Sequence, residues 1–221
     1  MKLVERLRPV EAKFLTEFEK DNSLNSENAL DLILSYLAIK GYLKVNKNEF
    51  TATEKKGNLR DYENKIISIV YDHNKSLENK ELDNFELSLG YYINDYSFND
   101  DMVNFGIFNK SKIEKRFLFV FKLRDTVYNP TEKFKEIISD LSELEKTITF
   151  KLKSGEKITK KELGMAYAFF GNRLIKDFDK TLLPYKEIFK TSSLLSSEVV
   201  DYTRKYMFNL MQPYNRFDNL F

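Results

Sequence analysis

The clearest pattern of hydrophobic and polar positions lies between residues 26 and 53. Apolar residues recur there at helical spacing up to Gly41; they are Leu30, Ile33, Leu34, Leu37 and Ala38. Glycine enters the left-handed conformation without strain, so a glycine just after the last periodic residue predicts a helix end. The next residues alternate around a turn at 46–48, which predicts a hairpin over about 42–53. Helix, glycine and hairpin in this order are typical of the second half of a winged-helix unit.

The same periodicity predicts further helices on both sides of this unit. Pro9 fits the first turn of a helix over about residues 10–19, and another helix follows over about 59–71. Thr159 and Glu162 form a capping-box pattern at the start of a helix to about residue 180. Gly164 and Gly171 inside that helix cost stability unless a neighbouring helix packs close to them. Asn129 is the expected N-cap of a helix over about 130–146, with Pro130 in its first turn. The other expected helices cover about residues 81–89, 98–105, 185–189 and 196–211.

Two later segments read as hairpins or repeats rather than as plain helices. Gly106 precedes Ile107 and Phe108 much as Gly41 precedes Tyr42, which is compatible with a degenerate repeat of the helix and strand unit. Apolar residues alternate with polar ones over residues 147–159, around a Ser-Gly pair. This alternation favours a second hairpin there over a helix.

The most hydrophobic segment is the run over residues 116–123, which is flanked by cations and has the length of a strand. One interpretation is a buried central strand. The other is an exposed apolar hairpin that contacts a membrane surface or another subunit, with its cations near anionic headgroups. The candidate contact residues are then Lys115, Arg116, Phe117, Leu118, Phe119, Val120, Phe121 and Lys122.

Together these patterns predict a mainly α-helical protein with short β-hairpins, in which a winged-helix-like N-terminal unit packs on a helical bundle. Residues 1–110 would form the winged-helix-like helical region with the degenerate repeat. Residues 111–221 would form a hairpin plus a helical region. No low-complexity linker separates the two regions, so we expect one continuous globular domain.

Composition narrows the function classes. The chain of 221 residues has 36 Lys and Arg against 34 Asp and Glu, and this net charge of +2 dictates no nucleic-acid or membrane partner. Cysteine is absent, which excludes disulfides, thiolate catalysis and Cys-ligated metals. The N-terminus lacks a signal-peptide pattern, and no run approaches the about 20 apolar residues that cross a bilayer. We therefore expect a cytoplasmic protein, with membrane association through the apolar hairpin.

Candidate chemistry is sparse. His73 is the only histidine, so no site can combine two histidine ligands. The sequence contains no dinucleotide-binding glycine motif, no phosphate-binding loop and no Gly-x-Ser-x-Gly. Neighbouring carboxylates such as Asp100 and Asp101 are expected by chance in a chain with 34 acids. We predict no enzymatic activity, no metal and no cofactor.

Basic residues around the first hairpin support an alternative function, nucleic-acid binding. The helix before that hairpin is mostly apolar and offers few donors to base edges, so this alternative ranks second. Its candidate phosphate contacts are Lys40, Lys44, Lys47, Lys55, Lys56 and Arg60.

The order of these motifs resembles the Golgi phosphoprotein three family and its bacterial relatives, which are mostly helical peripheral proteins. LSYLAIKGYL at 34–43 and MVNFGIF at 102–108 look like two helix ends of that family. Lys56-Gly57-Asn58 is similar to its Thr-Gly-Asp turn, residues 117–121 fall where it has a hydrophobic hairpin, and residues 163–183 resemble its penultimate helix. Phosphatidylinositol 4-phosphate binding is not carried over. The chain has no tryptophan, and Leu30 and the tyrosine-rich stretch 91–96 stand where the eukaryotic members have arginines.

A rival resemblance covers the first half of the chain. LRPVEAKFL at residues 7–15 and the units at Gly41 and Gly106 look like the tandem winged-helix cytoplasmic region of an uncharacterised class of bacterial membrane proteins. It leaves the residues after Phe121 unexplained. On either resemblance we expect a non-enzymatic binding or scaffolding protein whose partner is a membrane surface, another protein or a second copy of the chain.

Overall fold

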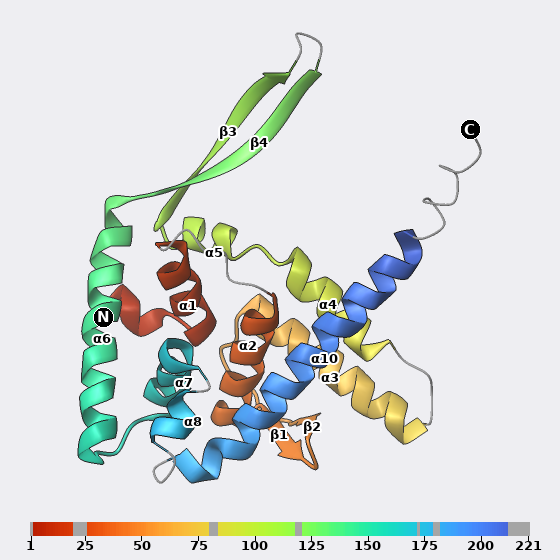
Figure 1. Cartoon of the computed structure of the whole chain (residues 1–221), viewed down its shortest axis with the longest axis vertical. Coiled ribbons are helices and arrows are strands. Elements are labelled where there is room, and N and C mark those ends of the chain that lie inside the picture. The colour runs from red at the N-terminus through yellow and green to blue at the C-terminus, as the bar shows by residue number, and fades with distance from the viewer. Residues whose placement is uncertain are drawn as a thin grey trace.

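A computed structural model describes residues 2–19, 26–79, 84–117, 121–171, 173–178 and 182–211. This part of the chain is mainly helical and contains two antiparallel hairpins, which confirms the predicted fold class. The helices form the body of the molecule, and one long hairpin projects from it (Figure 1).

The elements follow one another along the chain with short connections. In order they are η1 (Leu3–Arg6), α1 (Pro9–Phe18), α2 (Ser26–Lys40), β1 (Leu43–Asn46), β2 (Glu49–Ala52), α3 (Asp61–Asn79), α4 (Phe85–Asp95), α5 (Phe98–Asn104), β3 (Phe108–Phe117), β4 (Phe121–Pro130), α6 (Glu132–Ser154), α7 (Lys160–Phe170), α8 (Arg173–Asp177), η2 (Leu183–Tyr185) and α10 (Lys186–Met211).

Helix α2 lies at the centre of the core. Its residues 29, 30 and 32–39 are all buried, because α1, α4, α7 and α10 pack around it. The contact between α1 and α7 depends on Gly164, where an added Cβ would lie 2.9 Å from Pro9 Cγ and 2.9 Å from Tyr36 Cδ2. The expectation that a neighbouring element packs closely on this glycine is confirmed.

In the first helix–glycine–hairpin unit, α2 ends at Gly41 as predicted. Gly41 has a φ of 81°, its N–H donates to Ala38 O at 2.9 Å, and the Tyr42 N–H donates to Leu37 O at 2.9 Å. These two bonds are the Schellman pattern of a helix C-terminus. After β2, the Thr53 hydroxyl closes the unit by donating to the carbonyls of residues 41 and 42 at 3.0 and 3.1 Å.

The second unit repeats every one of these bonds. Gly106 has a φ of 69°, its N–H donates to Val103 O at 2.9 Å, and the Ile107 N–H donates to Met102 O at 2.8 Å. After β4, the Thr131 hydroxyl donates to the carbonyls of residues 106 and 107 at 3.0 and 2.9 Å. The two units therefore share one construction, and they differ mainly in hairpin length.

The hairpin predicted over residues 147–159 is wrong, because α6 continues through Ser154. Ile148 and Leu152 are buried and lie four residues apart, so they occupy one face of a helix. Phe150 created the apparent alternation, and 66% of its surface is exposed. The helix ends at Gly155, which has a φ of 73°.

Helix boundaries near the C-terminus also differ from the prediction. The capping box of Thr159 and Glu162 is confirmed, with bonds of 3.1 and 2.7 Å between each side chain and the other's backbone N–H. Helix α7 stops at Gly171 rather than near residue 180, so Gly171 ends this helix instead of lying inside it. Helix α6 begins at Glu132 after its N-cap Thr131, later than predicted, because Pro130 still belongs to β4. Helix α10 runs unbroken from residue 186 to 211, because the Ser196 hydroxyl donates back to Ser192 O at 2.7 Å instead of capping a new helix.

The apolar run at residues 116–123 is not one continuous strand. It covers the end of β3 and the start of β4, which pair antiparallel from Phe108 opposite Pro130 to Phe117 opposite Phe121. The topology is therefore a hairpin rather than a central strand. Leu118, Phe119 and Val120, together with the side chains of residues 113–117 and 121–125, lie outside the described part of the chain.

Candidate functional site

We name residues 108–130 the β3–β4 arm. Its two strands have ten residues each and pair only with each other among the described residues. The hairpin stands away from the helical body in Figure 1. Residues 109–112 are exposed, so the arm leaves the surface of the body within a few residues of its base.

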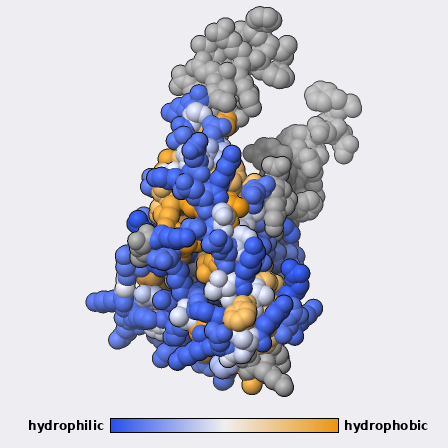
Figure 2. All heavy atoms as spheres, turned by 90° about the vertical axis from the view of Figure 1, so that its left-hand side faces the viewer, coloured by the Kyte–Doolittle hydropathy of each residue, from blue (hydrophilic) through white to orange (hydrophobic). Residues whose placement is uncertain are grey.

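Phe108 anchors the arm in the core. Its side chain is 1% exposed, and its ring lies 4.6 Å from that of Phe18 and 5.8 Å from that of Phe134, centroid to centroid. On the face shown in Figure 2, hydrophilic residues cover most of the described part of the arm, and hydrophobic residues gather where it joins the body. The base of the arm is therefore fixed by apolar packing.

The pairing register assigns residues 108–117 and 121–130 of the arm to one of two faces, because alternate residues of a strand share a face and paired residues lie on the same side. One face carries the pairs Phe117 with Phe121, Lys115 with Leu123, Ile113 with Asp125 and Ser111 with Val127. The other carries Arg116 with Lys122, Glu114 with Arg124, Lys112 with Thr126 and Lys110 with Tyr128. The first face thus holds Phe117, Phe121 and Leu123, and the second face holds most of the cations.

The second face meets the body at its base. Asp100 at the start of α5 accepts hydrogen bonds from Lys110 Nζ at 2.7 Å and from Tyr128 OH at 3.0 Å. The hydrogen bond with Lys110 is the main cause that lowers the pKa of Asp100 below its ordinary range. On the first face, Asn129 Nδ2 donates to Ser111 Oγ at 3.3 Å within the arm itself. The body therefore approaches the arm from its cationic side.

Charge is concentrated in the arm. Residues 108–130 include six Lys and Arg against two carboxylates, whereas the rest of the chain has 30 Lys and Arg against 32 carboxylates. A whole-chain charge of +2 conceals this difference. The arm is therefore a cationic projection that an anionic surface attracts.

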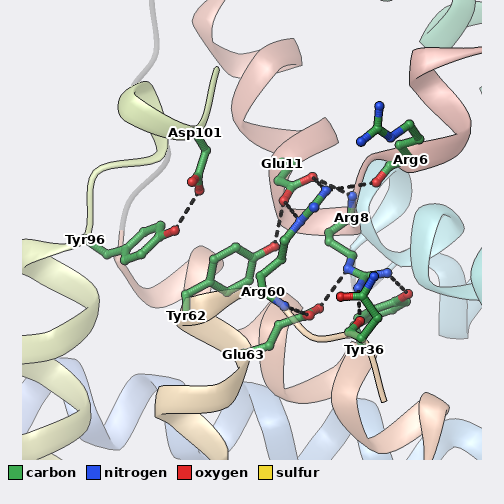
Figure 3. Close-up of polar contacts among 10 residues, drawn as sticks. Arg6, Arg8, Glu11, Tyr36, Arg60, Tyr62, Glu63, Tyr96 and Asp101 are labelled. Carbon is green, nitrogen blue, oxygen red and sulfur yellow. Dashed lines mark hydrogen bonds and ion pairs between the residues drawn. The ribbon is translucent and has the colours of Figure 1, made fainter. Parts of the chain in front are cut away.

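A second polar cluster, shown in Figure 3, joins the starts of α1 and α3. Arg8 and Arg60 each precede a helix, and each backbone N–H donates to the glutamate three residues later, to Glu11 at 2.9 Å and to Glu63 at 2.7 Å. The side chains cross over: Arg8 Nε lies 3.1 Å from Glu63 Oε1, and Arg60 Nε lies 2.9 Å from Glu11 Oε1. We call this reciprocal set the Arg–Glu clasp.

The Arg–Glu clasp has a structural role. Both glutamate side chains are almost fully buried, and Tyr62 OH donates to Glu11 at 3.0 Å. Burial raises the pKa of Glu63 and of Tyr62 above their ordinary values. Each carboxylate is held by a helix-start N–H and a guanidinium, so the clasp compensates its buried charges internally.

The structure separates the residues predicted to contact nucleic acid. Arg60 belongs to the clasp, and Lys55 Nζ donates to Lys40 O and lies 4.7 Å from the centre of the Tyr42 ring. Lys44, Lys47 and Lys56 are exposed around the β1–β2 hairpin. Lys44, Lys47, Lys55 and Lys56 are therefore exposed, Lys40 is half-buried, and Arg60 is held in contacts within the body.

Neither helix that precedes a hairpin has the form of a recognition helix. Helix α2 is enclosed by its neighbours, and α5 is only seven residues long with Asp100 and Asp101 in its first turn. A recognition helix needs an exposed face with hydrogen-bond donors for base edges. The two units therefore share the winged-helix order of elements without that surface.

The cluster of polar residues around Asp31 was not among the site residues predicted from the sequence. Asp31 in α2 accepts hydrogen bonds from Ser192 Oγ of α10 at 2.6 Å and from Tyr167 OH of α7 at 2.8 Å. Burial is the largest cause that raises its pKa from 3.8 to about 6. A cavity of about 110 Å³ beside it is lined also by Lys13 and Asn28. The sequence signal that could have indicated this cluster is a carboxylate within the apolar stretch of a helix.

His73 stacks on Phe85, with ring centroids 4.0 Å apart and an angle of 13° between the rings. The pair lies at a cavity of about 360 Å³, whose lining also includes Asp72, Ser76 and Ser88. No group of three or more His, Cys, Asp or Glu residues that could hold a metal ion occurs among the described residues. The absence of enzymatic activity remains a prediction.

Within the described ranges, none of the helices combines the length and apolar character needed to cross a membrane. No known family model, curated protein or solved structure matches the chain.

Proposed function

We propose that the chain is a non-enzymatic binding protein and that the β3–β4 arm attaches it to an anionic lipid surface. The observation that carries this proposal is the position of the apolar run. The last pair in the register of the hairpin is Phe117 with Phe121, and residues 118–120 connect them in the sequence, so the run belongs to the end of the arm farthest from Phe108. Cations at residues 115, 116, 122 and 124 directly flank it.

The magnitudes favour apolar contact as the main source of affinity. Burying a Phe, Leu or Val side chain contributes about 1.5–3 kcal/mol. A Lys or Arg near an anionic membrane contributes about 1 kcal/mol, and salt screens it. Five apolar residues therefore outweigh the four flanking cations. We expect binding that weakens at high salt but does not disappear.

The charge distribution orients the molecule on such a surface. Outside residues 108–130, carboxylates exceed Lys and Arg by two, so an anionic surface does not attract the body as a whole. The arm carries the excess of cations and stands away from the body. The arm would therefore contact the lipid first.

The β1–β2 hairpin supports a second candidate function, nucleic-acid binding. Lys44, Lys47 and Lys56 are exposed around it and could contact phosphates. Because α2 is enclosed, such binding would lack base readout and would depend steeply on salt. We rank it second for this reason.

Three single substitutions at the end of the arm test the proposal: Phe117→Asp, Phe119→Asp and Phe121→Asp. We expect all three proteins to melt cooperatively like the parent chain. At least two of them should lose co-sedimentation with vesicles of phosphatidylcholine and phosphatidylserine, because a charge replaces an apolar contact. Phe108→Asp is the matched control, since Phe108 is buried in the body and its replacement should abolish cooperative folding.

The other outcomes separate the alternatives. Loss of cooperative melting in all three variants would place the run in the folded core and end the proposal. Intact vesicle binding by all three would contradict it as well. A shift of an oligomer to monomer without vesicle binding would indicate a second copy of the chain as partner. Duplex DNA binding that is lost only when Lys44, Lys47 and Lys56 become Glu would indicate the second candidate.

A further inference from the structure

The β3–β4 arm has two faces of different chemistry, and this difference bears on how it would meet a lipid surface. By register, the face of Arg116 carries five of the six arm cations, namely Lys110, Lys112, Arg116, Lys122 and Arg124, against one carboxylate, Glu114. The opposite face carries Phe117, Phe121, Leu123 and Ile113, with Lys115 and Asp125 as its charged members. The arm is thus an amphipathic ribbon over much of its length.

We infer that the arm binds an anionic lipid surface lengthwise, with the face of Phe117, Phe121, Leu123 and Ile113 toward the acyl chains and the cationic face at the level of the phosphates. This inference rests on the proposed function and specifies the contact that the arm makes. It adds two positions beyond residues 117–121, namely Leu123 and Ile113, to the binding surface.

The open edges of the ribbon argue against deep insertion of its end. Each strand has only the other as a partner among the described residues, so its outer edge presents N–H and C=O groups without a ladder partner. In hydrocarbon each such group costs several kcal/mol. A ribbon lying in the interface keeps its backbone among hydrated headgroups, while its apolar face reaches about 5–10 Å into the acyl boundary, as amphipathic helices do.

The base of the arm leaves the apolar face accessible. Asp100 of α5 binds Lys110 and Tyr128, which belong to the cationic face. Helix α5 therefore lies on the side opposite to the proposed contact. Asp125, which pairs with Ile113, marks the limit of the apolar face toward the base, because a carboxylate there favours water.

Single fluorescent labels test this orientation, and the absence of cysteine from the chain makes them specific. The variants are Ile113→Cys and Leu123→Cys on the apolar face, Thr126→Cys on the cationic face, and Phe119→Cys in the apolar run. Residue 126 is one pair from residue 113, so these two labels are matched in distance along the arm. The probe is a vesicle of phosphatidylcholine and phosphatidylserine with brominated acyl chains.

We expect strong quenching at 119, 123 and 113 and weak quenching at 126. Quenching at 119 with equally weak quenching at 113, 123 and 126 would show end-on insertion, which overturns this inference and leaves the proposed function standing. Equal quenching at 113 and 126 would overturn it too. No quenching and no sedimentation at all would overturn both.

An unlabelled pair gives an independent readout. Leu123→Ser should weaken vesicle binding by about ten-fold or more, because it removes apolar area that the lipid surface would take out of water. Thr126→Ser changes a nearby position on the other face and should leave binding within about two-fold. Unchanged affinity of Leu123→Ser would contradict lengthwise binding.

Discussion

At the scale of single residues, Asp31 shows how tertiary contacts retain a costly group in the core. It lies in α2 between Leu30 and Leu32, which are buried, and receives hydrogen bonds from Ser192 and Tyr167. These bonds favour the charged form, but desolvation exceeds them and raises the pKa to about 6. Its two donors come from α7 and α10, so Asp31 ties three helices together.

This raised pKa predicts a stability change with pH. The folded chain holds the proton of Asp31 more tightly than the unfolded chain, whose ordinary pKa is 3.8. The stability from this group is fully present below pH 3.8 and is lost as the pH rises through about 6. Asp31→Asn removes the titration, and an amide still accepts from Ser192. We expect it to stabilise the protein at pH 7.5 by up to about 3 kcal/mol in urea unfolding.

The advantage of Asp31→Asn should disappear at about pH 4, where the parent carboxyl is largely protonated. Asp95→Asn, at an exposed position of α4, is the control and should shift stability little at either pH. A less stable Asp31→Asn protein at pH 7.5 would mean that the charged carboxylate and its hydrogen bonds outweigh desolvation.

At the scale of elements, the β3–β4 arm is a lengthened version of the β1–β2 hairpin. Both follow a left-handed glycine, and both end at a threonine whose hydroxyl donates to the two carbonyls at the glycine. The short hairpin shows that this construction needs only four residues in each strand. Most residues of the arm are therefore not needed to close the helix–glycine–hairpin unit.

Trimming the arm to the length of its counterpart should leave the fold intact. Replacing residues 111–127 by Asn-Gly joins Lys110 to Tyr128, which are register partners, through a two-residue turn. Phe108 and the contacts to Asp100 remain. We expect cooperative thermal unfolding within a few degrees of the parent and no vesicle binding. Adding Phe108→Ala to the trimmed protein should cost about 3–5 kcal/mol. A trimmed protein without a cooperative transition would show that the arm supports the body.

At the scale of the whole molecule, the Arg–Glu clasp joins the N-terminal segment to the start of α3. The paired residues are about fifty positions apart, and each glutamate serves both its own helix start and the opposite arginine. Arg60 also donates to Arg6 O at 3.1 Å and lies 4.9 Å from the Phe105 ring. The clasp thus connects η1, α1, α3 and the end of α5.

Breaking one member of the clasp should destabilise the whole fold. Arg60→Ala leaves the Glu11 carboxylate, which is 0% exposed, without its guanidinium. Loss of one partner of a buried pair costs about 3–5 kcal/mol, and we expect about 2–3 kcal/mol because Arg60 is partly exposed. Urea unfolding measures this change. Adding Glu11→Gln should recover part of the loss, and Arg6→Ala, at an exposed position, should have little effect. Equal stability of Arg60→Ala and the parent would contradict this role.

Some features of the candidate site could be predicted from the sequence, and others became known only from the structure. The sequence identified residues 115–122 as an apolar segment with flanking cations, because hydropathy and charge are properties of the residues themselves. It did not identify the separation into two faces, since face assignment depends on which residues pair. It also grouped Arg60 with solvent-facing lysines, because a list of cations does not show which ones the fold uses internally.

Local signals in the sequence determined where several elements end. Gly41, Gly106 and the Thr159–Glu162 pair act through neighbouring backbone groups, so their positions alone indicated the helix ends that the structure contains. Only the tertiary structure decided that residues 147–154 continue a helix, that the serines of α10 bond back into it, and that Asp31 and the two glutamates of the Arg–Glu clasp bind partners from distant segments. These outcomes depend on contacts between residues far apart in the chain. The free energy of such tertiary packing outweighs the weak local propensities on which a prediction from sequence relies.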